Sequence, residues 1–265
     1  DDITEIERIE KLAQEVMRAG GDGKKRRLLD VIRQIESRSI KGLEDEQTVS
    51  DKVVIFTESV RTMESLRDYL EENGFKDLVT TFSGTKEGPI ADRALARWQE
   101  EVGKFLSPAL ESGAAIRGAL IHEFKTRTRI LIATEAGAKG LNLQFCNCLI
   151  NYDLPWNPQR IEQRIGRVHR YGQKHDVLIV NFINLSNEAE ARVYELLEEK
   201  LHVFTETLGA SDTIINQPEV ALNLEVRINE ILDRCRTQEQ IREEFDKLSL
   251  ELDEVQRQMH DEKLR

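Results

Sequence analysis

The stretch KVVIFT, residues 52–57, decides the fold class of this chain. It is short, continuously apolar and rich in β-branched residues, a composition typical of a strand that is covered on both faces in a parallel sheet. A helical pattern follows at residues 60–72, with Met63, Leu66 and Leu70 on one face. A buried strand followed by an amphipathic helix is the repeating unit of α/β proteins.

Further strand patterns recur along the chain. They cover residues 78–82, 129–134, 147–152 and 177–182, with helical or loop segments between them. The alternation predicts an α/β fold with a mostly parallel sheet and right-handed crossovers. Ligands of such sheets bind at the carboxyl ends of the strands. The polar residues that directly follow strands are therefore candidate site residues, namely Thr57, Glu58, Ser83, Gly84, Thr134, Glu135 and Asp153.

One connection, residues 83–125, is longer than a crossover requires. We interpret it as an insertion with helices of its own, including a helix at residues 91–102. It either grips a substrate or only decorates the domain, and decoration is the default interpretation.

A turn with glycines follows a strand pattern in ILIATEAGAKGLNL, residues 130–143. Gly137 and Gly140 would let backbone N–H groups approach a bound group closely, often a phosphate. Glycines after strands are common, so the turn alone is weak support for a site. Its place shortly before an arginine-rich stretch strengthens the prediction.

That stretch, NPQRIEQRIGRVHRYGQ at residues 157–173, predicts a helix. Asn157 suits the N-cap, and Pro158 suits the first helical position because its missing N–H costs nothing there. Three aliphatic residues have the spacing of one apolar stripe for the core: Ile161, Ile165 and Val168.

The polar side of the predicted helix is cationic, with four arginines and a glutamine: Arg160, Arg164, Arg167, Arg170 and Gln163. Gln163, Arg167 and Arg170 share one stripe and are expected to project together. Like charges on one face repel, so an anionic partner would explain the arrangement, and arginine suits phosphate oxygens and transition-state charge. A solvated basic helix is the alternative, and from this stretch alone the two interpretations are equal.

The composition indicates a globular protein with a charged exterior. The chain has 265 residues, 39% of them hydrophobic and 33% charged, enough for one large domain or a domain with an appendage. No apolar run approaches the roughly 20 residues of a membrane span, and there is no secretory signal, so we expect no membrane partner. The chain starts at Asp1, and we expect it to be part of a longer protein.

The net charge of −11 at first argues against a nucleic-acid partner, but its distribution changes that. Residues 186–265 contain 20 acidic and 10 basic residues, which leaves a net charge of about −1 for the first 185 residues. The acidity therefore belongs to the C-terminal part, and the rest of the chain can carry basic faces.

The three cysteines suit a reducing compartment better than a disulfide framework. Cys146 and Cys148 lie in an apolar segment without a second pair of metal ligands, which favours a buried strand over a zinc site. No metal site is predicted within this chain.

Helical segments flank the predicted sheet. Residues 1–23 predict an amphipathic helix, and residues 24–37 a second helix whose basic start favours solvation over phosphate contacts. Residues 187–208 predict a helix that packs on the core. Residues 210–265 predict an acidic helical hairpin or coiled-coil-like arm, for which docking of a partner protein, a dimer seam and a brace against the domain all remain open.

Three of these stretches, in this order, resemble the C-terminal-lobe motifs of superfamily 2 helicases and translocases. They are KVVIFTES (52–59), ILIATEAGAKGLNLQ (130–144) and YDLPWNPQRIEQRIGRVHRYGQ (152–173). The WNP triplet, the GLNL and the final HRYGQ are most similar to the Swi/Snf-type remodelling ATPases and their bacterial RapA-like relatives. The resemblance covers residues 24–209. It implies the second of two RecA-like lobes, with ATP bound between the lobes and nucleic acid running across both.

The resemblance also implies roles for individual residues. Arg167 and Arg170 match the arginine fingers that reach the terminal phosphates of ATP, and Gln163 matches the glutamine that opens that motif. Gly140 and Asn142 match the motif that couples the nucleotide cleft to the nucleic-acid track.

The strand ends supply the expected nucleic-acid contacts. Thr57 and Thr134 match positions near the backbone of the tracked strand, and Ser83 and Lys139 are expected to contact nucleic acid beside them.

The phosphate loop of such motors does not occur in this sequence. Gly21–Lys25 lacks both the spacing and the hydroxyl of that loop, and the acidic run Glu44–Glu46 lies in a polar linker rather than after a strand. We therefore expect an N-terminal RecA-like lobe outside this chain to hold Mg²⁺ and cradle the phosphates of ATP. This chain alone is expected not to hydrolyse ATP.

Two classes of function remain open. The first is half of a nucleic-acid-dependent ATPase, expected to move along double-stranded DNA without necessarily separating its strands. The second is a non-catalytic module of the same fold that binds nucleic acid, or a protein through the acidic arm. The intact arginine pair favours the first. Residues Gln163–Ile165, which open the arginine-finger motif, and the 83–125 insertion depart from the pattern of the Swi/Snf-type remodelling ATPases. We therefore expect a bacterial or archaeal, cytoplasmic, nucleoid-associated translocase.

Overall fold

The computed structural model describes residues 22–37, 51–84, 89–102, 112–170, 173, 175–200 and 218–263, together with Arg8 and Lys11. Nearly all of the helix predicted for residues 1–23 lies outside the described residues. The end of the helix predicted at residues 187–208 lies outside them as well.

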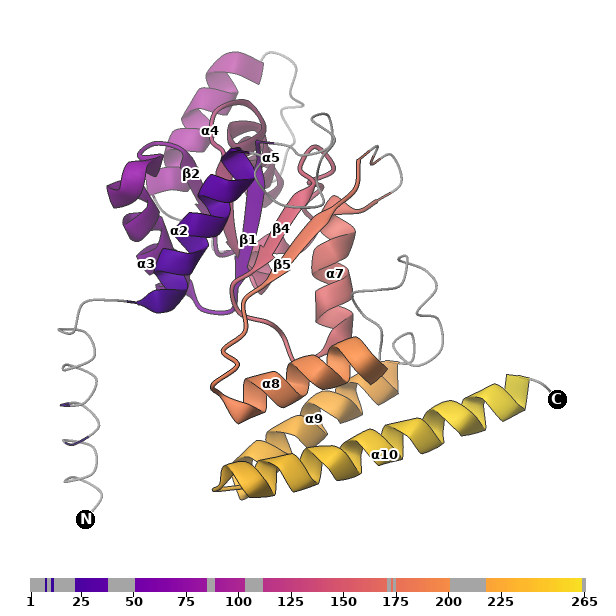
Figure 1. The fold of residues 1–265 in the computed structure, drawn as a ribbon. Coiled ribbons are helices and arrows are strands. Elements are labelled where there is room, and N and C mark those ends of the chain that lie inside the picture. The colour runs from indigo at the N-terminus through magenta and orange to yellow at the C-terminus, as the bar shows by residue number, and fades with distance from the viewer. Residues whose placement is uncertain are drawn as a thin grey trace.

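A five-stranded parallel sheet forms the centre of the molecule (Figure 1). Its strands are β1 (Val53–Thr57), β2 (Val79–Phe82), β3 (Ile130–Thr134), β4 (Cys148–Asn151) and β5 (Leu178–Asn181). They lie in the order β2-β3-β1-β4-β5, and every neighbouring pair is parallel. All residues of β1, β3 and β4 are buried, as expected of continuously apolar strands covered on both faces. The predicted fold class and the five predicted strands are confirmed.

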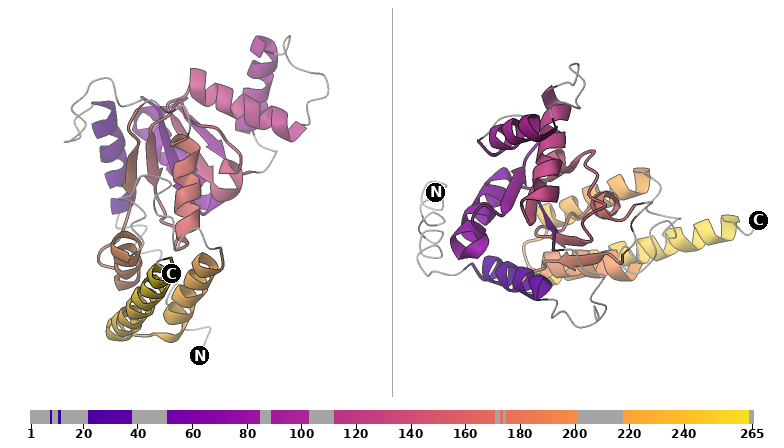
Figure 2. Two further views of the ribbon diagram at one scale, coloured as in Figure 1. Left: turned by 90° about the vertical axis from the view of Figure 1, so that its right-hand side faces the viewer. Right: turned by 90° about the horizontal axis from the view of Figure 1, so that it is seen from above.

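Helices α2 (Gly23–Glu36) and α3 (Val60–Leu70) cover one face of the sheet (Figure 2). Leu28 and Ile32 of α2 and Leu66 of α3 are almost completely buried against strand residues such as Ile55. After α3 the chain makes a tight turn, Glu71–Phe75, in which Gly74 takes a φ of 106°. That left-handed conformation favours glycine and ends the helix before β2.

Helices α4 (Pro89–Val102) and α5 (Ser112–Thr126) cover the opposite face (Figure 2). Trp98 of α4 and Phe124 of α5 are buried in one cluster with Phe56 of β1 and Leu131 of β3. The interpretation of the 83–125 segment as decoration is therefore wrong for these helices. They form a layer of the core, because their apolar faces cover strands that would otherwise be exposed.

The C-terminal helices gather at one end of the sheet (Figure 1). They are α8 (Glu188–Glu195), the π-helical turn Leu196–Lys200, α9 (Pro218–Arg234) and α10 (Gln238–Lys263). Leu224 and Ile228 of α9 and Phe245 of α10 share a buried cluster with Ile161 and Ile165, which belong to helix α7 (Pro158–Val168). Of the three interpretations of the arm, the structure supports a brace against the domain.

Candidate functional site

Helix α7 starts where its sequence predicts. The side chain of Asn157 accepts a hydrogen bond from the Gln159 backbone N–H at 2.9 Å, and Pro158 occupies the first position. The predicted apolar stripe is buried, with Ile161, Ile165 and Val168 each at most 2% exposed.

Helix α7 ends earlier than predicted, at Val168, and His169 is extended with φ −94° and ψ 98°. The prediction that Arg170 lies on this helix with Gln163 and Arg167 is therefore wrong. After the helix, Gln173 returns to donate side-chain hydrogen bonds to the carbonyls of Gln144, Cys146 and Val168. Arg170 is exposed just beyond the helix end.

A groove of about 620 Å³ runs between α7 and the short helix α6 (Glu135–Ala138). Gln163 and Arg167 line it from α7, Lys139 lines it from the end of α6, and Phe56 of β1 lies at its base. The groove thus brings together Gln163, Arg167 and Lys139, and it is also lined by Glu135, one of the candidates at the strand ends. Arg170 is not among its lining residues.

The turn after Lys139 is built for a specific backbone path. Gly140 has a φ of 81°, a left-handed conformation that favours glycine. Leu143 is buried, and its backbone N–H donates a 3.0 Å hydrogen bond to the carbonyl of Arg167. Asn142 is exposed, and its side-chain oxygen accepts from the Gln144 N–H at 3.4 Å. Backbone contacts therefore fix this turn against the end of α7.

The two strand-end threonines are buried neighbours, paired across β1 and β3. The hydroxyl of Thr57 donates to the carboxylate of Asp153. The hydroxyl of Thr134 donates to the carbonyl of Ser83 at 3.0 Å and accepts from the Gly137 N–H at 3.4 Å. Both hydroxyls are thus used within the protein, whereas Lys139 is exposed.

Arg164 also lies elsewhere than the sequence predicts. It was grouped with the polar side of the helix, but its side chain is 1% exposed. Its Nε donates to Glu135 at 3.0 Å, and its Nη1 donates to the Asn151 side chain at 3.0 Å and to the Asp153 carbonyl at 2.7 Å. Its Nη2 lies 2.9 Å from the same Glu135 oxygen, in an ion-pair contact without hydrogen-bond geometry.

The surroundings of Arg164 act on its charge in opposite directions. Burial lowers the pKa of the Arg164 guanidinium, while the carboxylate of Glu135 acts to raise it. One signal in the sequence points to this burial. Arg164 follows Ile161 by three positions and precedes Ile165 by one, so it lies at the border of the apolar stripe.

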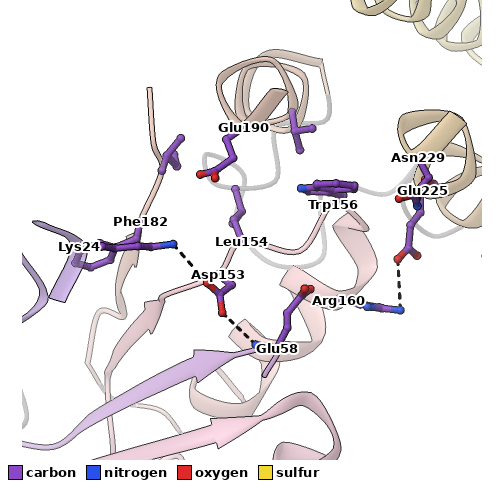
Figure 3. Close-up of a pocket in the computed structure, with 12 residues that line it drawn as sticks. Lys24, Glu58, Asp153, Leu154, Trp156, Arg160, Phe182, Glu190, Glu225 and Asn229 are labelled. Carbon is purple, nitrogen blue, oxygen red and sulfur yellow. Dashed lines mark hydrogen bonds and ion pairs between the residues drawn. The ribbon is translucent and has the colours of Figure 1, made fainter. Parts of the chain in front are cut away.

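A second cavity, of about 360 Å³, lies where β1, β4 and β5 end (Figure 3). Helix α2 contributes Lys24, whose Nζ lies 3.4 Å from Asp153 and 4.6 Å from the centre of the Tyr152 ring. Acidic residues outnumber basic ones in its lining: Glu58, Asp153, Glu190 and Glu225 against Lys24 and Arg160. An excess of carboxylates disfavours phosphate, so the groove beside α7 is the better candidate for an anionic ligand.

Two of the three cysteines occupy the buried positions that the sequence predicts. Cys146 and Cys148 are fully buried, and Cys148 begins β4. Among the described residues, no group of three or more His, Cys, Asp or Glu side chains is arranged to hold a metal ion. None of the helices in the described part of the chain is long and apolar enough to cross a membrane.

Comparisons with known proteins agree with the position of these motifs. The family model "Helicase conserved C-terminal domain" matches residues 110–172, which include α6, the following turn and α7. A Bacillus subtilis protein described as "Uncharacterized ATP-dependent helicase YqhH" is 36% identical over 224 residues, which cover 84% of this chain and 35% of that protein. The RNA polymerase-associated protein RapA of Vibrio vulnificus is 40% identical over 89 residues, which cover 34% of this chain and 9% of RapA.

Among solved structures, the C-terminal part of the Fun30 ATPase domain matches with a TM-score of 0.47 and 21% identity, covering 86% of this chain and 63% of that one. The chain spans about a third of YqhH and about a tenth of RapA. The chain thus contains a match to the helicase conserved C-terminal domain, and its motifs and its parallel sheet resemble the C-terminal RecA-like lobe of superfamily 2 helicases, with similarity to the ATP-dependent helicase YqhH and to the Swi/Snf-like RapA proteins.

Proposed function

We propose that this chain is the second motor lobe of a longer protein, the parent protein, which hydrolyses ATP and moves along double-stranded DNA. In this proposal an N-terminal RecA-like lobe binds ATP and Mg²⁺, and the present lobe supplies Arg167 and Arg170 to the terminal phosphates. We place the parent protein in the cytoplasm of a bacterium or archaeon, at the nucleoid. The observation that carries the proposal is the groove in which Gln163 and Arg167 lie with Lys139.

The groove has the donors that a polyphosphate requires. The guanidinium of Arg167 can donate two parallel hydrogen bonds to phosphate oxygens, and Gln163, one helical turn earlier, can donate its amide. Arg164 and Glu135 neutralise each other in the wall, so the free positive charge comes from Arg167, Lys139 and Arg160. Arg160 is itself paired with Glu225 at 3.4 Å, which leaves Arg167 and Lys139 as the main attraction for an anion.

The chemistry follows from the charge that develops during phosphoryl transfer. ATP with its Mg²⁺ supplies the reacting phosphate, and there is little covalent work for the protein to do. A guanidinium held against the phosphate oxygens stabilises the transition state more than the ground state. Loss of Arg167 should therefore lower turnover much more than it lowers ATP affinity. Arg170 follows the helix on an exposed segment and is proposed to reach the nucleotide when the lobes close.

The proposed nucleic-acid contacts lie on the carboxyl side of β1, β2 and β3. Lys139 and the backbone around Gly140 are exposed and suit the phosphates of a nucleic-acid strand. Thr57, Thr134 and Ser83 lie beneath this surface. The hydroxyl of Thr57 donates to Asp153, and that of Thr134 donates to the Ser83 carbonyl and accepts from the Gly137 N–H, and these bonds shape the strand ends. Their contribution to nucleic-acid binding is proposed to come from that shape.

The alternative is a non-catalytic module that docks a partner protein through the acidic arm. RapA is described as RNA polymerase-associated, which gives this class a precedent among the relatives. In this structure the apolar faces of α9 and α10 are used against α7 and α8, which favours a bracing role. If the arm only docks a partner protein and the chain is non-catalytic, replacing Arg167 should not change ATP turnover.

The test is ATP turnover by the parent protein with duplex DNA, single-stranded DNA or RNA. We expect duplex DNA to stimulate turnover most, and we expect Lys139→Ala to raise the DNA concentration needed for half-maximal stimulation. The matched control is Arg129→Ala, since Arg129 precedes β3 at the opposite end of the sheet and pairs with Glu36. Turnover that no nucleic acid stimulates would contradict the proposal.

A further inference from the structure

Arg164 joins the ends of three strands to helix α7. Its guanidinium lies 5.3 Å from the centre of the Phe56 ring on β1, contacts Glu135 directly after β3, and donates to Asn151 on β4. Glu135 is 29 residues from Arg164 in the sequence, and Phe56 and Asn151 are register partners on the neighbouring strands β1 and β4. One buried arginine therefore joins the middle of α7 to the strand ends, in addition to the apolar contacts of Ile161, Ile165 and Val168.

The contact with Glu135 links two surfaces of the proposed site. Glu135 begins α6, and this four-residue helix leads directly into Lys139 and Gly140. The same turn is attached to α7 a second time, by the 3.0 Å hydrogen bond from the Leu143 N–H to the Arg167 carbonyl. A displacement of the turn would thus be transmitted to α7 by two contacts. One is the side-chain contact of Glu135 with Arg164 in the middle of the helix, and the other is the backbone hydrogen bond from Leu143 to Arg167 near the end of the helix.

Core packing alone does not require an arginine at this position. A buried ion pair is costly to desolvate, and apolar residues of similar volume often give equal or greater stability. What a guanidinium adds is fixed geometry, because its planar fork can bind Glu135, Asn151 and a carbonyl in set directions. Lysine would keep the charge but lose that geometry.

We propose that Arg164 is a positioning residue: through Glu135 it transmits contact with nucleic acid at the Lys139–Gly140 turn to the placement of Arg167 on the nucleotide. This inference rests on the proposed function, but the mechanical link is a property of the chain itself. It does not need ATP or nucleic acid to be measured.

The first measurement is amide hydrogen exchange in this chain. Glu135→Gln keeps the size of the side chain and removes the charge that Arg164 binds. We expect exchange across residues 158–168 and 136–143 to become faster together, by about tenfold, the effect of losing one charge-assisted hydrogen bond. The matched control is Glu36→Gln, which removes the charge of the nearer of the two ion-pair partners of Arg129 at the other end of β3 and should leave both segments unchanged. Unchanged exchange at residues 158–168 in Glu135→Gln overturns the link.

The second measurement is the ratio of DNA-stimulated to basal ATP turnover in the parent protein. We expect Glu135→Gln and Arg164→Lys each to lower this ratio about tenfold, with the KM for ATP within twofold of wild type, and the double variant to be no worse than either single one. If wild type shows no stimulation, the proposed function fails while the exchange result still decides the link. If exchange accelerates but the stimulation ratio stays at the wild-type value, Arg164 is structural and the positioning role is wrong.

Discussion

The carboxylate of Glu225 on α9 accepts a 3.0 Å hydrogen bond from the side-chain amide of Asn157, the residue that caps α7. Its other oxygen lies 3.4 Å from the guanidinium of Arg160, one turn into the same helix. A negative charge at a helix N-terminus is also favoured by the helix dipole. The C-terminal arm is thus attached at the start of the helix that carries Arg167.

Glu225→Ala should weaken this attachment. We expect a loss of about 1 kcal/mol in the free energy of unfolding, mostly from the hydrogen bond to Asn157, because the ion pair with Arg160 is partly exposed and adds little. Urea denaturation measures the loss, and hydrogen exchange should show faster exchange at the start of α7. The control is Glu230→Ala, since Glu230 lies on the same helix but lines a separate groove between α9 and α10. Equal effects of the two substitutions would contradict this attachment.

Gly137→Ala should be strongly destabilising. A Cβ at this position would lie 2.1 Å from the carbonyl oxygen and 2.7 Å from the carbonyl carbon of Phe82, both backbone atoms of β2. Since backbone cannot move aside as a side chain can, we expect a loss of about 2–3 kcal/mol in the free energy of unfolding. Denaturant titration measures it, and wild-type stability in this variant would mean that α6 does not contact β2 as described.

Gly166→Ala provides the opposite case. A Cβ there meets nothing within 4 Å, and alanine is favoured over glycine inside a helix by about 0.5–1 kcal/mol. We expect a higher melting temperature for the isolated chain. In the parent protein we expect lower ATP turnover, because the added methyl would occupy the face beside Arg167 that closes on the nucleotide. ATP turnover equal to that of wild type would contradict this expectation and would mean that the face beside Arg167 does not close on the nucleotide.

The cysteines should differ sharply in reactivity. Burial raises the pKa of the Cys146 thiol to about 12 and also raises the pKa of Cys148, so neither forms the reactive thiolate at neutral pH. Cys235 is partly exposed. Titration with a thiol reagent at about pH 8 should modify one cysteine in the native chain and all three after denaturation. Rapid modification of Cys146 or Cys148 without denaturant would contradict their burial.

The attachment of α10 to α8 should depend on pH through Glu188. Hydrogen bonding from Arg242 holds the pKa of the Glu188 carboxyl below its ordinary value. Because the folded-state pKa is the lower one, this contribution to stability is present above the ordinary glutamate pKa of about 4.3 and is lost as the pH falls through the folded-state value. The stability difference between wild type and Glu188→Gln should therefore shrink as the pH falls from about 6 to 3. A constant difference over that range would mean that Glu188 is not paired.

The sheet was predictable because its strands are continuously apolar and lie in sequence between helical patterns. β1 and β3 have all five residues buried, and such strands occur almost only in parallel sheets covered on both faces. The start of α7 was equally predictable, since capping by Asn157 and Pro158 is a local effect. Gln163, Arg167 and Lys139, which line the groove, were all named from the motifs.

The features that the sequence did not reveal depend on contacts between distant segments. The place of Arg164 at the border of the apolar stripe is compatible with burial, but its partner Glu135 lies 29 residues away, and no helical periodicity identifies that partner. The end of α7 depends on the return of Gln173 to carbonyls that include that of Gln144. Helices α4 and α5 looked like decoration because the face of the sheet that they cover cannot be identified from their own residues.

Arg167 is proposed to act on ATP that is bound to another lobe of the parent protein. The most direct measurement is single-turnover ATP hydrolysis by the DNA-bound parent protein, with ATP affinity measured in parallel, for wild type, Arg167→Ala and the control Arg129→Ala. We predict that Arg167→Ala lowers the hydrolysis rate by about 10³-fold or more while ATP affinity changes little, and that Arg129→Ala behaves as wild type. Hydrolysis at the wild-type rate in Arg167→Ala would contradict the proposed action of Arg167 on ATP. Helix α7 would then have a role in binding or structure.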